Sequence, residues 1–135
     1  MLQRFNTIVA CLITAGLLGC DDANRVEIQG SVTYDGVAVE KGTISLSSLE
    51  ADSSSDAVSD AGEIENGRYA LETSLGKKRV EIRASRPLPP ERQNNPEMGL
   101  LYEDFIPPSY NRESTLTVDI TEDGQRDFDF DLATP

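Results

Sequence analysis

Cys20 is the residue whose surroundings point most directly to chemistry. It closes the run LITAGLLGC, which is apolar or small apart from one threonine, and the acidic pair Asp21-Asp22 follows at once. One charge, Arg4, precedes this run, and no charge lies between Phe5 and Cys20. The apolar stretch is long enough for the h-region of a signal peptide, but it is shorter than the roughly 20 residues that a membrane-spanning helix needs. The pattern predicts an exported protein whose signal ends at the cysteine.

The tetrapeptide Leu17-Leu18-Gly19-Cys20 resembles the lipobox of bacterial lipoprotein signal peptides. That resemblance implies cleavage between Gly19 and Cys20 and a diacylglyceryl group on the Cys20 thiol. We therefore expect residues 1–19 to be a cleaved signal peptide, residues 20–24 to be the lipidated cysteine and a short tether, and residues 25–135 to be a folded domain. The expected location is the extracytoplasmic, periplasmic face of the cell membrane, held by a lipid anchor of two or more acyl chains.

Two other interpretations of Cys20 are open. An ordinary signal peptide would leave a free thiol here, and the second cysteine, Cys11, offers a disulfide partner. Signal cleavage would exclude that disulfide, because Cys11 would leave with the signal. The choice between inner and outer membrane is also open, although Asp21 is a hint of inner-membrane retention in the lipoprotein family.

The composition of the chain argues against several functional classes. It has 12 Lys and Arg residues against 24 Asp and Glu residues, for a net charge of −12, whereas nucleic acid binding needs a basic surface. The same charge disfavours adhesion to anionic lipid head groups. The chain has no histidine, which removes the usual zinc ligand and the base of a serine triad. We therefore expect no enzymatic activity, no metal, no cofactor and no nucleic acid partner.

Alternation of apolar and polar residues with a period of two is the dominant pattern after Asn24. The strands that it predicts lie around residues 26–34, 43–47, 69–71, 79–84, 116–121 and 127–132. Asp35-Gly36 and Asp123-Gly124 predict tight turns between strands. About seven short strands joined by turns are typical of β-sandwiches. The predicted fold is therefore all-β, a single antiparallel β-sandwich of about seven strands.

Two stretches lack this alternation. Residues 50–61, EADSSSDAVSDA, are acidic and serine-rich and predict a mobile loop. Arg86–Asn111 contains most of the prolines and predicts a long loop, of a kind that is often functional or disordered. Within it, residues 97–106 could form one or two turns of helix, a length that Gly99 and Pro107 would limit.

Four phrases of the mature chain resemble bacterial lipoproteins with a transthyretin-like sandwich, also called carboxypeptidase regulatory-like domains. The phrases are VEIQGSVTYDGVAVEKGTISL, GEIENGRYAL, GKKRVEIRAS and IPPSYNRESTLTVDI. The positions that fit the family pattern are Gly30, Val32, Tyr34, Gly36, Val39, Gly42, Ile44, Asn66, Gly67, Tyr69, Gly76, Val80 and Ile82. Ala38 stands where proline is usual, and Leu75 replaces proline before Gly76. The resemblance implies the fold over nearly all the mature chain but says little about function.

Two groups of residues are candidates for binding. Tyr102, Phe105 and Tyr110 of the long loop could contact a partner or cap one end of the sandwich, and capping is the commoner fate in a small domain. A C-terminal acidic group could bind calcium or form a solvated outer face: Asp119, Glu122, Asp123, Asp127, Asp129 and Asp131. The functional hypothesis is a non-enzymatic binding or structural module of the cell envelope with a protein or glycan partner. The alternative is an accessory carbohydrate- or calcium-binding domain.

Overall fold

The described part of the chain is all-β, as predicted. The computed structural model describes residues 25–50, 59–93, 97 and 99–135, so the predictions for the signal peptide, for Cys20 and for most of the 50–61 loop lie outside it. Its elements are β1 (Arg25–Tyr34), β2 (Val37–Ala38), β3 (Lys41–Ser48), β4 (Ser59–Glu65), β5 (Arg68–Ser74), β6 (Gly76–Pro87), the 3-10 helix η1 (Pro90–Arg92), β7 (Tyr102–Asp104), the 3-10 helix η3 (Pro108–Tyr110), β8 (Thr117–Ile120) and β9 (Phe130–Leu132). Within these ranges there is no α-helix, and no helix is long and apolar enough to cross a membrane.

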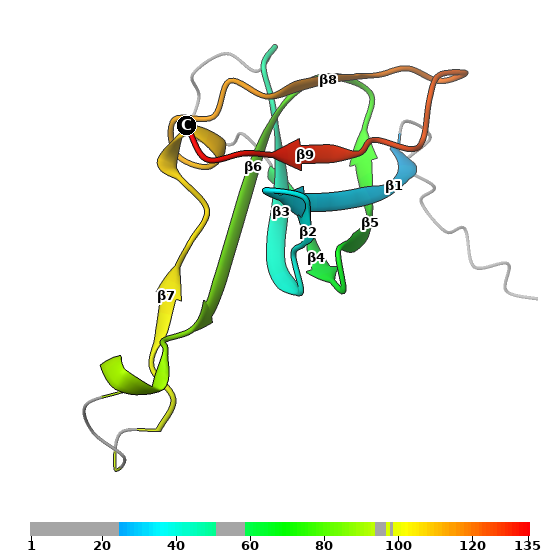
Figure 1. Cartoon of the computed structure of the whole chain (residues 1–135). Coiled ribbons are helices and arrows are strands. Elements are labelled where there is room, and N and C mark those ends of the chain that lie inside the picture. The colour runs from blue at the N-terminus through cyan, green and yellow to red at the C-terminus, as the bar shows by residue number, and fades with distance from the viewer. Residues whose placement is uncertain (1–24, 51–58, 94–96, 98) are drawn as a thin grey trace, which may run out of the picture.

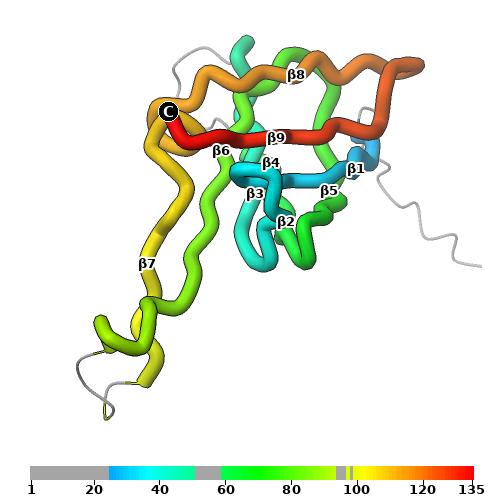
Figure 2. The backbone as a smooth tube through the Cα atoms, viewed as in Figure 1, coloured from blue at the N-terminus to red at the C-terminus, as the bar shows by residue number. Residues whose placement is uncertain are grey.

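The strands form one curled sheet (Figure 1). Its order is β2-β1-β5-β4-β3-β6-β7, and all neighbours on this path are antiparallel. The long strand β6 pairs with β8 through Gly76–Arg79 and with β7 through Ser85–Pro87. Figure 2 shows the consequence, with β8 at one end of the sheet and β7 with the last part of β6 reaching away at the other. We call Ser85–Pro87, β7 and the described residues between them the arm.

The last strand departs from the predicted antiparallel pattern, because β9 runs parallel to β1. Val32 lies opposite Phe130 and Tyr34 lies opposite Leu132. A parallel pair needs a connection longer than a hairpin, and here the rest of the domain lies between the two strands. The Asp123-Gly124 turn forms at residues 122–124, but it leads β9 to β1 and not back along β8.

The core lies inside the curl of the sheet and follows the predicted alternation. Its buried apolar residues are Ile28, Val32, Val39, Ile44, Leu46, Ile64, Tyr69, Leu71, Val80, Ile82, Ala84, Ile106, Ile120 and Leu132. Full burial of one aliphatic side chain contributes about 1.5–3 kcal/mol. On β6 the intervening residues Arg79, Glu81 and Arg83 lie on the other face. The sheet thus buries one face of each main strand, as a period of two requires.

Two hairpin turns have the backbone that their residue types predict. Asp35 and Gly36 adopt φ values of 50° and 80°, and Asn66 and Gly67 adopt 51° and 75°. Two consecutive positive φ values are the signature of a two-residue type I′ turn, whose twist matches that of the strands it joins. The first turn joins β1 to β2 with Tyr34 opposite Val37, and the second joins β4 to β5.

Three local predictions from the sequence are corrected by the structure. Ser59–Ala61, assigned to the mobile loop, begin β4 and pair with Ser45–Ser47 of β3. Residues 97–106 contain the strand β7 in place of a helix. Arg86–Asn111 is therefore not a structureless loop, because it also includes the end of β6, η1 and η3. Pairing with neighbouring strands supplied the order that the local sequence did not predict.

Candidate functional site

A groove lies between the β1–β2 hairpin and the arm, and we call it the hairpin–arm groove. It has a volume of about 580 Å³, and Tyr34, Val37, Glu40, Arg86, Tyr102 and Phe105 are among its lining residues. Binding sites for small molecules are commonly of this size, with apolar walls and a few polar groups. The groove contains two of the three predicted contact residues and is the candidate site.

The hairpin wall of the groove is fixed at its tip by Asp35. The Asp35 carboxylate accepts hydrogen bonds from the Thr134 backbone N–H at 2.8 Å and from the Thr134 hydroxyl at 2.6 Å. These hydrogen bonds, first that of the hydroxyl and then that of the backbone, lower the pKa of Asp35, because they favour the charged carboxylate. The C-terminal segment therefore holds the β1–β2 turn in place.

The floor of the groove is aromatic. The ring centroids of Tyr34 and Phe105 lie 5.7 Å apart with an interplanar angle of 63°, an edge-to-face contact. The guanidinium of Arg86 lies 5.2 Å from the centroid of the Phe105 ring, within the range of a cation–π interaction. The backbone N–H of Phe105 also donates to the Ala84 carbonyl of β6 at 3.2 Å. The backbone of Phe105 is therefore fixed to β6, and its ring packs against Tyr34 of β1.

The arm is organised by one glutamate and one glutamine. Glu103 accepts a hydrogen bond from Arg86 Nε at 3.1 Å and another from Arg92 Nη2 at 2.7 Å. The bond from Arg86 is the main reason that the pKa of Glu103 is lowered. Gln93 donates to the carbonyl oxygens of Leu88 and Leu101 at 2.9 and 3.0 Å and accepts the Leu101 N–H at 2.9 Å. The arm is therefore an ordered two-stranded ribbon.

The rim of the groove exposes large apolar groups from both of its walls. Val37 on the hairpin is 70% exposed and Tyr102 on the arm is 59% exposed. Single exposed apolar side chains are normal in a folded protein, but a group of them around a recess is a feature of interaction sites. The geometry of the groove therefore suits contact with a partner.

The three predicted contact residues lie in two places. Tyr102 and Phe105 both line the hairpin–arm groove. Tyr110 lies against the core, where its hydroxyl donates to the Ala133 carbonyl at 3.0 Å and accepts the Ala133 N–H at 3.2 Å. Phe105 and Tyr110 pack against the core and Ile106 is buried in it, so these three residues cap the sheet, as one of the two predictions for the loop had it. Tyr102 is exposed.

Sequence reasoning missed the hairpin residues of the site. Tyr34 and Val37 line the groove, yet they are far in sequence from Tyr102 and Phe105. The alternation of β1 assigned Tyr34 only to the core face. The Asp35-Gly36 turn was the available signal, since residues next to a tight turn lie at an end of the sheet where loops gather.

The C-terminal aspartates form a hydrogen-bonded ladder with β1. Oδ1 of Asp127 accepts from Gln29 at 2.9 Å, and Oδ1 of Asp131 accepts from the Thr33 hydroxyl at 2.6 Å. Between them Asp129 accepts the backbone N–H and the hydroxyl of Ser31, both at 2.8 Å. The hydroxyl bond from Ser31, then the backbone bond, lowers the pKa of Asp129. This outer face thus fixes the register of the parallel pair β1–β9.

Calcium is expected to leave the thermal unfolding midpoint of this protein unchanged. Calcium needs six to eight oxygen ligands, whereas one oxygen of each ladder aspartate already accepts a hydrogen bond from β1. Among the described residues there is no group of three or more acidic, Cys or His side chains arranged to hold a metal ion. Differential scanning fluorimetry with a millimolar excess of calcium, and magnesium as the control, measures this. A calcium-specific rise of the midpoint would contradict the expectation, because a ligand of the folded state must raise it.

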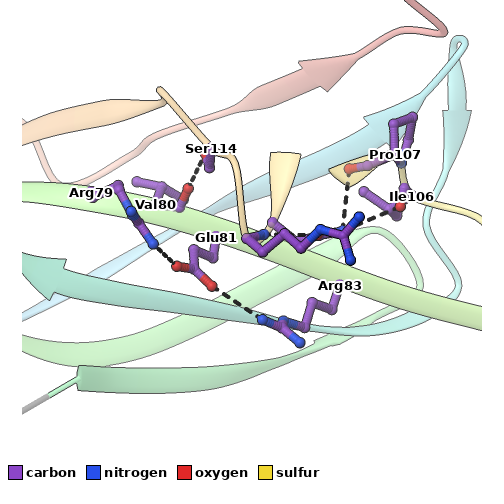
Figure 3. A network of polar contacts seen from close by, with 9 residues as sticks. Arg79, Val80, Glu81, Arg83, Ile106, Pro107 and Ser114 are labelled. Carbon is purple, nitrogen blue, oxygen red and sulfur yellow. Dashed lines mark hydrogen bonds and ion pairs between the residues drawn. The ribbon is translucent and has the colours of Figure 1, made fainter. Parts of the chain in front are cut away.

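A second recess, of about 320 Å³, is lined by Arg83, Arg112 and Asp104. Both arginines are paired with glutamates: Arg83 lies 3.4 Å from Glu81, and Arg112 lies 3.5 Å from Glu113. Figure 3 shows Glu81 between Arg79 and Arg83 on β6. The hydrogen bond from Arg79 is the first reason that the pKa of Glu81 is lowered. These compensated charges make the recess a poor anion site.

A buried polar cluster lies where β1 begins and β5 ends. Asp60 is 8% exposed, and its carboxylate accepts from Arg25 at 2.7 Å and from the buried Thr73 hydroxyl at 2.8 Å. Lys78, only 2% exposed, donates to the Ser74 hydroxyl at 2.6 Å. Hydrogen bonding is what allows such groups to be buried. We assign the cluster a structural role.

Truncation of the two groove aromatics is expected to have different effects on stability, because Tyr102 is exposed and Phe105 is packed. Tyr102→Ala should change the free energy of unfolding by less than about 0.5 kcal/mol, because the side chain is mostly exposed. Phe105→Ala should lower it by about 2 kcal/mol, less than for a fully buried ring, because the ring packs on Tyr34 and Arg86. Urea unfolding followed by circular dichroism measures both values. Equal losses for the two variants would contradict this assignment.

Comparisons with known proteins contribute little to this site. No family model and no curated protein matches the chain. Among solved structures, a 9R-lipoxygenase from Cyanothece aligns with a TM-score of 0.38 and 13% sequence identity. The alignment covers 84% of this chain but only 17% of the lipoxygenase chain. A similarity of this size carries no argument about fold or function.

Proposed function

We propose that this chain is an extracytoplasmic lipoprotein, tethered to the membrane through Cys20, that binds a partner in the hairpin–arm groove. The groove carries the proposal, because it combines an aromatic floor with exposed apolar groups on its rim. Ion-paired arginine and glutamate hold the arm that forms one wall. The partner that we propose is a protein or glycan of the cell envelope, and the function is binding and not catalysis.

The course of β1 supports a groove that faces away from the membrane. β1 begins at Arg25, shortly after Cys20, and continues for 10 residues to Tyr34 at the groove floor. At about 3.3 Å per residue, a strand of this length spans about 30 Å. An anchor at Cys20 would place the start of β1 nearest the lipid and the Asp35-Gly36 turn at the opposite end of that strand. A partner outside the membrane could then approach the groove without obstruction by the bilayer.

We also propose that the curled sheet is the transthyretin-like β-sandwich to which the sequence motifs point. Two glycines of the motif support this assignment, because both stand where a side chain would collide with a neighbouring backbone. An ideal Cβ on Gly42 would lie 2.5 Å from the Arg83 carbonyl oxygen, and one on Gly30 would lie 1.9 Å from the Phe128 carbonyl oxygen. The motif residues thus have a steric reason in this fold, independent of any function.

Fatty-acid labelling tests the anchor. Cells that express the full chain and are fed a radiolabelled fatty acid are expected to label the wild type and not Cys20→Ser, because the acyl chains require the thiol. Cys11→Ser is the matched control and should be labelled like the wild type. Equal labelling of Cys20→Ser would remove the lipoprotein proposal.

Capture from an envelope extract tests the groove. The full chain in a non-ionic detergent should retain a partner that Tyr102→Ala fails to retain, since the variant loses exposed contact area and no core packing. Leu49→Ala is the control, because Leu49 is also exposed, at 50%, but does not line the groove. Equal loss in both variants would exclude the groove as the binding site.

A further inference from the structure

The outer edge of β7 has backbone groups that pair with no strand among the described residues. Leu88 donates its N–H to the Leu101 carbonyl at 2.8 Å, and Phe105 donates to Ala84 at 3.2 Å, with Glu103 opposite Arg86 between them. The backbone N–H and C=O groups of residues 101, 103 and 105 therefore point toward β6. Those of Tyr102 and Asp104 point away from β6, because alternate residues of a strand bond to opposite sides. β7 ends the order of the described sheet, and Figure 1 shows it at the border of the molecule.

The edge is ordered before any partner arrives. The pairing of β7 with β6, the two arginines on Glu103 and the Gln93 hydrogen bonds all lie on the inner side of the strand or across the arm. An added strand would leave these contacts intact. A pre-formed edge loses little conformational freedom on binding, which favours affinity.

The side chains beside this edge are typical of a site for strand addition. Tyr102 and Asp104 lie two residues apart on the same face of β7, and both are exposed. In such complexes the main-chain hydrogen bonds supply affinity, and pockets for alternate side chains supply specificity. The hairpin–arm groove, with Tyr102 in its wall, provides a recess beside this strand.

Charge decides which kind of strand would bind. The chain carries a net charge of −12, so a second copy would bring like charge to the edge, whereas a basic segment would be attracted. Asp104 places a carboxylate on the edge strand. In the groove, the carboxylates of Asp35 and Glu40 lie beside two cations, Lys41 and Arg86, and Arg86 is already paired with Glu103. Unpaired edges of this kind otherwise promote self-association. The charge therefore favours a basic partner over a dimer.

We propose that the outer edge of β7 binds an extended, basic segment of a partner protein as an additional strand. This inference rests on the proposed function and narrows its partner to a protein. The backbone carbonyl groups of the segment would accept hydrogen bonds from the N–H groups of Tyr102 and Asp104, and its own N–H groups would donate to the carbonyl groups of these two residues. Its alternate side chains would lie beside Tyr102 and Asp104.

A model peptide tests the backbone interaction. The probe is the acetylated and amidated hexapeptide Lys-Val-Lys-Val-Lys-Val, added to the full chain in a non-ionic detergent. Amide hydrogen exchange of Tyr102 and Asp104, followed by NMR, is expected to slow at least about tenfold on saturation, while the Glu103 amide changes little. A Glu-Val hexapeptide should bind at least about tenfold more weakly, a difference of about 1.4 kcal/mol.

Two variants of Asp104 separate the contribution of its backbone N–H to peptide binding from that of its carboxylate. Asp104→Pro and Asp104→Ala both lose the carboxylate, but only the proline removes the outward N–H, and that N–H makes no bond to β6. Asp104→Pro should bind the Lys-Val peptide several-fold more weakly than Asp104→Ala, with the circular dichroism spectra of both unchanged. If the proline disturbs the fold, a second peptide replaces the variant. A Lys-Val hexapeptide that is N-methylated at alternate residues lacks the N–H donors that would bond to the β7 carbonyl groups, so it should bind the wild-type chain more weakly than the unmethylated peptide does.

The results that overturn this inference differ from those that overturn the proposed function. Unchanged exchange at Tyr102 and Asp104 under saturating peptide excludes strand addition, as does equal binding by the proline and alanine variants. Equal binding of the acidic peptide excludes the basic partner, and dimer formation in sedimentation would assign the edge to a second copy. Loss of the lipoprotein proposal in the labelling experiment would leave the peptide result unaffected.

Discussion

Replacing Gly30 by alanine is expected to lower the free energy of unfolding by about 3 kcal/mol. An ideal Cβ at this position would lie 1.9 Å from the Phe128 carbonyl oxygen and 3.1 Å from the ring of Tyr69. Neither neighbour can retreat easily, because the Tyr69 hydroxyl donates to that same carbonyl at 2.7 Å. The added methyl group must therefore push the segment that leads into β9 away from β1 or displace a buried ring.

Chemical denaturation of Gly30→Ala beside Gly36→Ala measures this effect. Gly36 has a φ of 80° but nothing within 4 Å of an added Cβ, so its alanine variant carries backbone strain alone, of about 1 kcal/mol. Gly30→Ala should also increase hydrogen exchange at the Phe128 amide, which bonds to Gln29 at 2.8 Å. A loss for Gly30→Ala no larger than for Gly36→Ala would show that β9 can shift without cost.

Removal of the Asp60 carboxylate is expected to destabilise the fold by about 2 kcal/mol. Asp60→Ala would leave the fully buried Thr73 hydroxyl with only the long 3.5 Å contact to the Ser74 carbonyl, and it would remove an ion-pair partner of Arg25. The value is below that of a fully buried ion pair, because the Arg25 side chain is 33% exposed. Asp119→Ala on the exposed side of β8 is the control and should change stability by less than about 0.5 kcal/mol.

The same carboxylate should make stability depend on pH in the acid range. Burial raises the pKa of Asp60, but the hydrogen bonds and charge of Arg25 and the bonds from Thr73 and Ser74 together lower it below 3.8. A carboxyl whose pKa is lower in the folded state stabilises the fold above its unfolded pKa, and this contribution is lost as the pH falls through the folded pKa. Urea unfolding at pH 6 and at pH 3 should therefore show a smaller fall in stability for Asp60→Asn than for the wild type. An equal fall in both would assign the acid sensitivity to other carboxylates.

Residue pattern alone predicted most of the strands. The alternation around Ile44, Val80 and Ile120 matched β3, β6 and β8, because the buried face of a strand demands an apolar residue at every second position. The Asp35-Gly36 turn was predictable for a similar reason, since few residue types tolerate two consecutive positive φ values. Such signals are local, and they need no knowledge of the rest of the chain.

The strands that the sequence missed are those stabilised by their neighbours. The sequence of β4 is rich in acidic and small residues, and it forms a strand because it pairs with Lys41–Ser47 of β3. β7 has three residues and follows a proline-rich segment, and it forms because the end of β6 offers a partner. Tertiary context overrides weak local preference more readily in strands than in helices.

Local residue types thus established the all-β class, the inward face of most strands and the main hairpin turn, because each depends on a few neighbouring positions. They also pointed to Cys20 and to Tyr102 and Phe105 as residues of interest. Three features depend on contacts between residues far apart in the chain: the parallel docking of β9 on β1, the groove between hairpin and arm, and the position of β7 at the end of the described sheet. Those features arise only when the sheet curls, since the curl brings Tyr34 beside Phe105 and leaves β7 at the border.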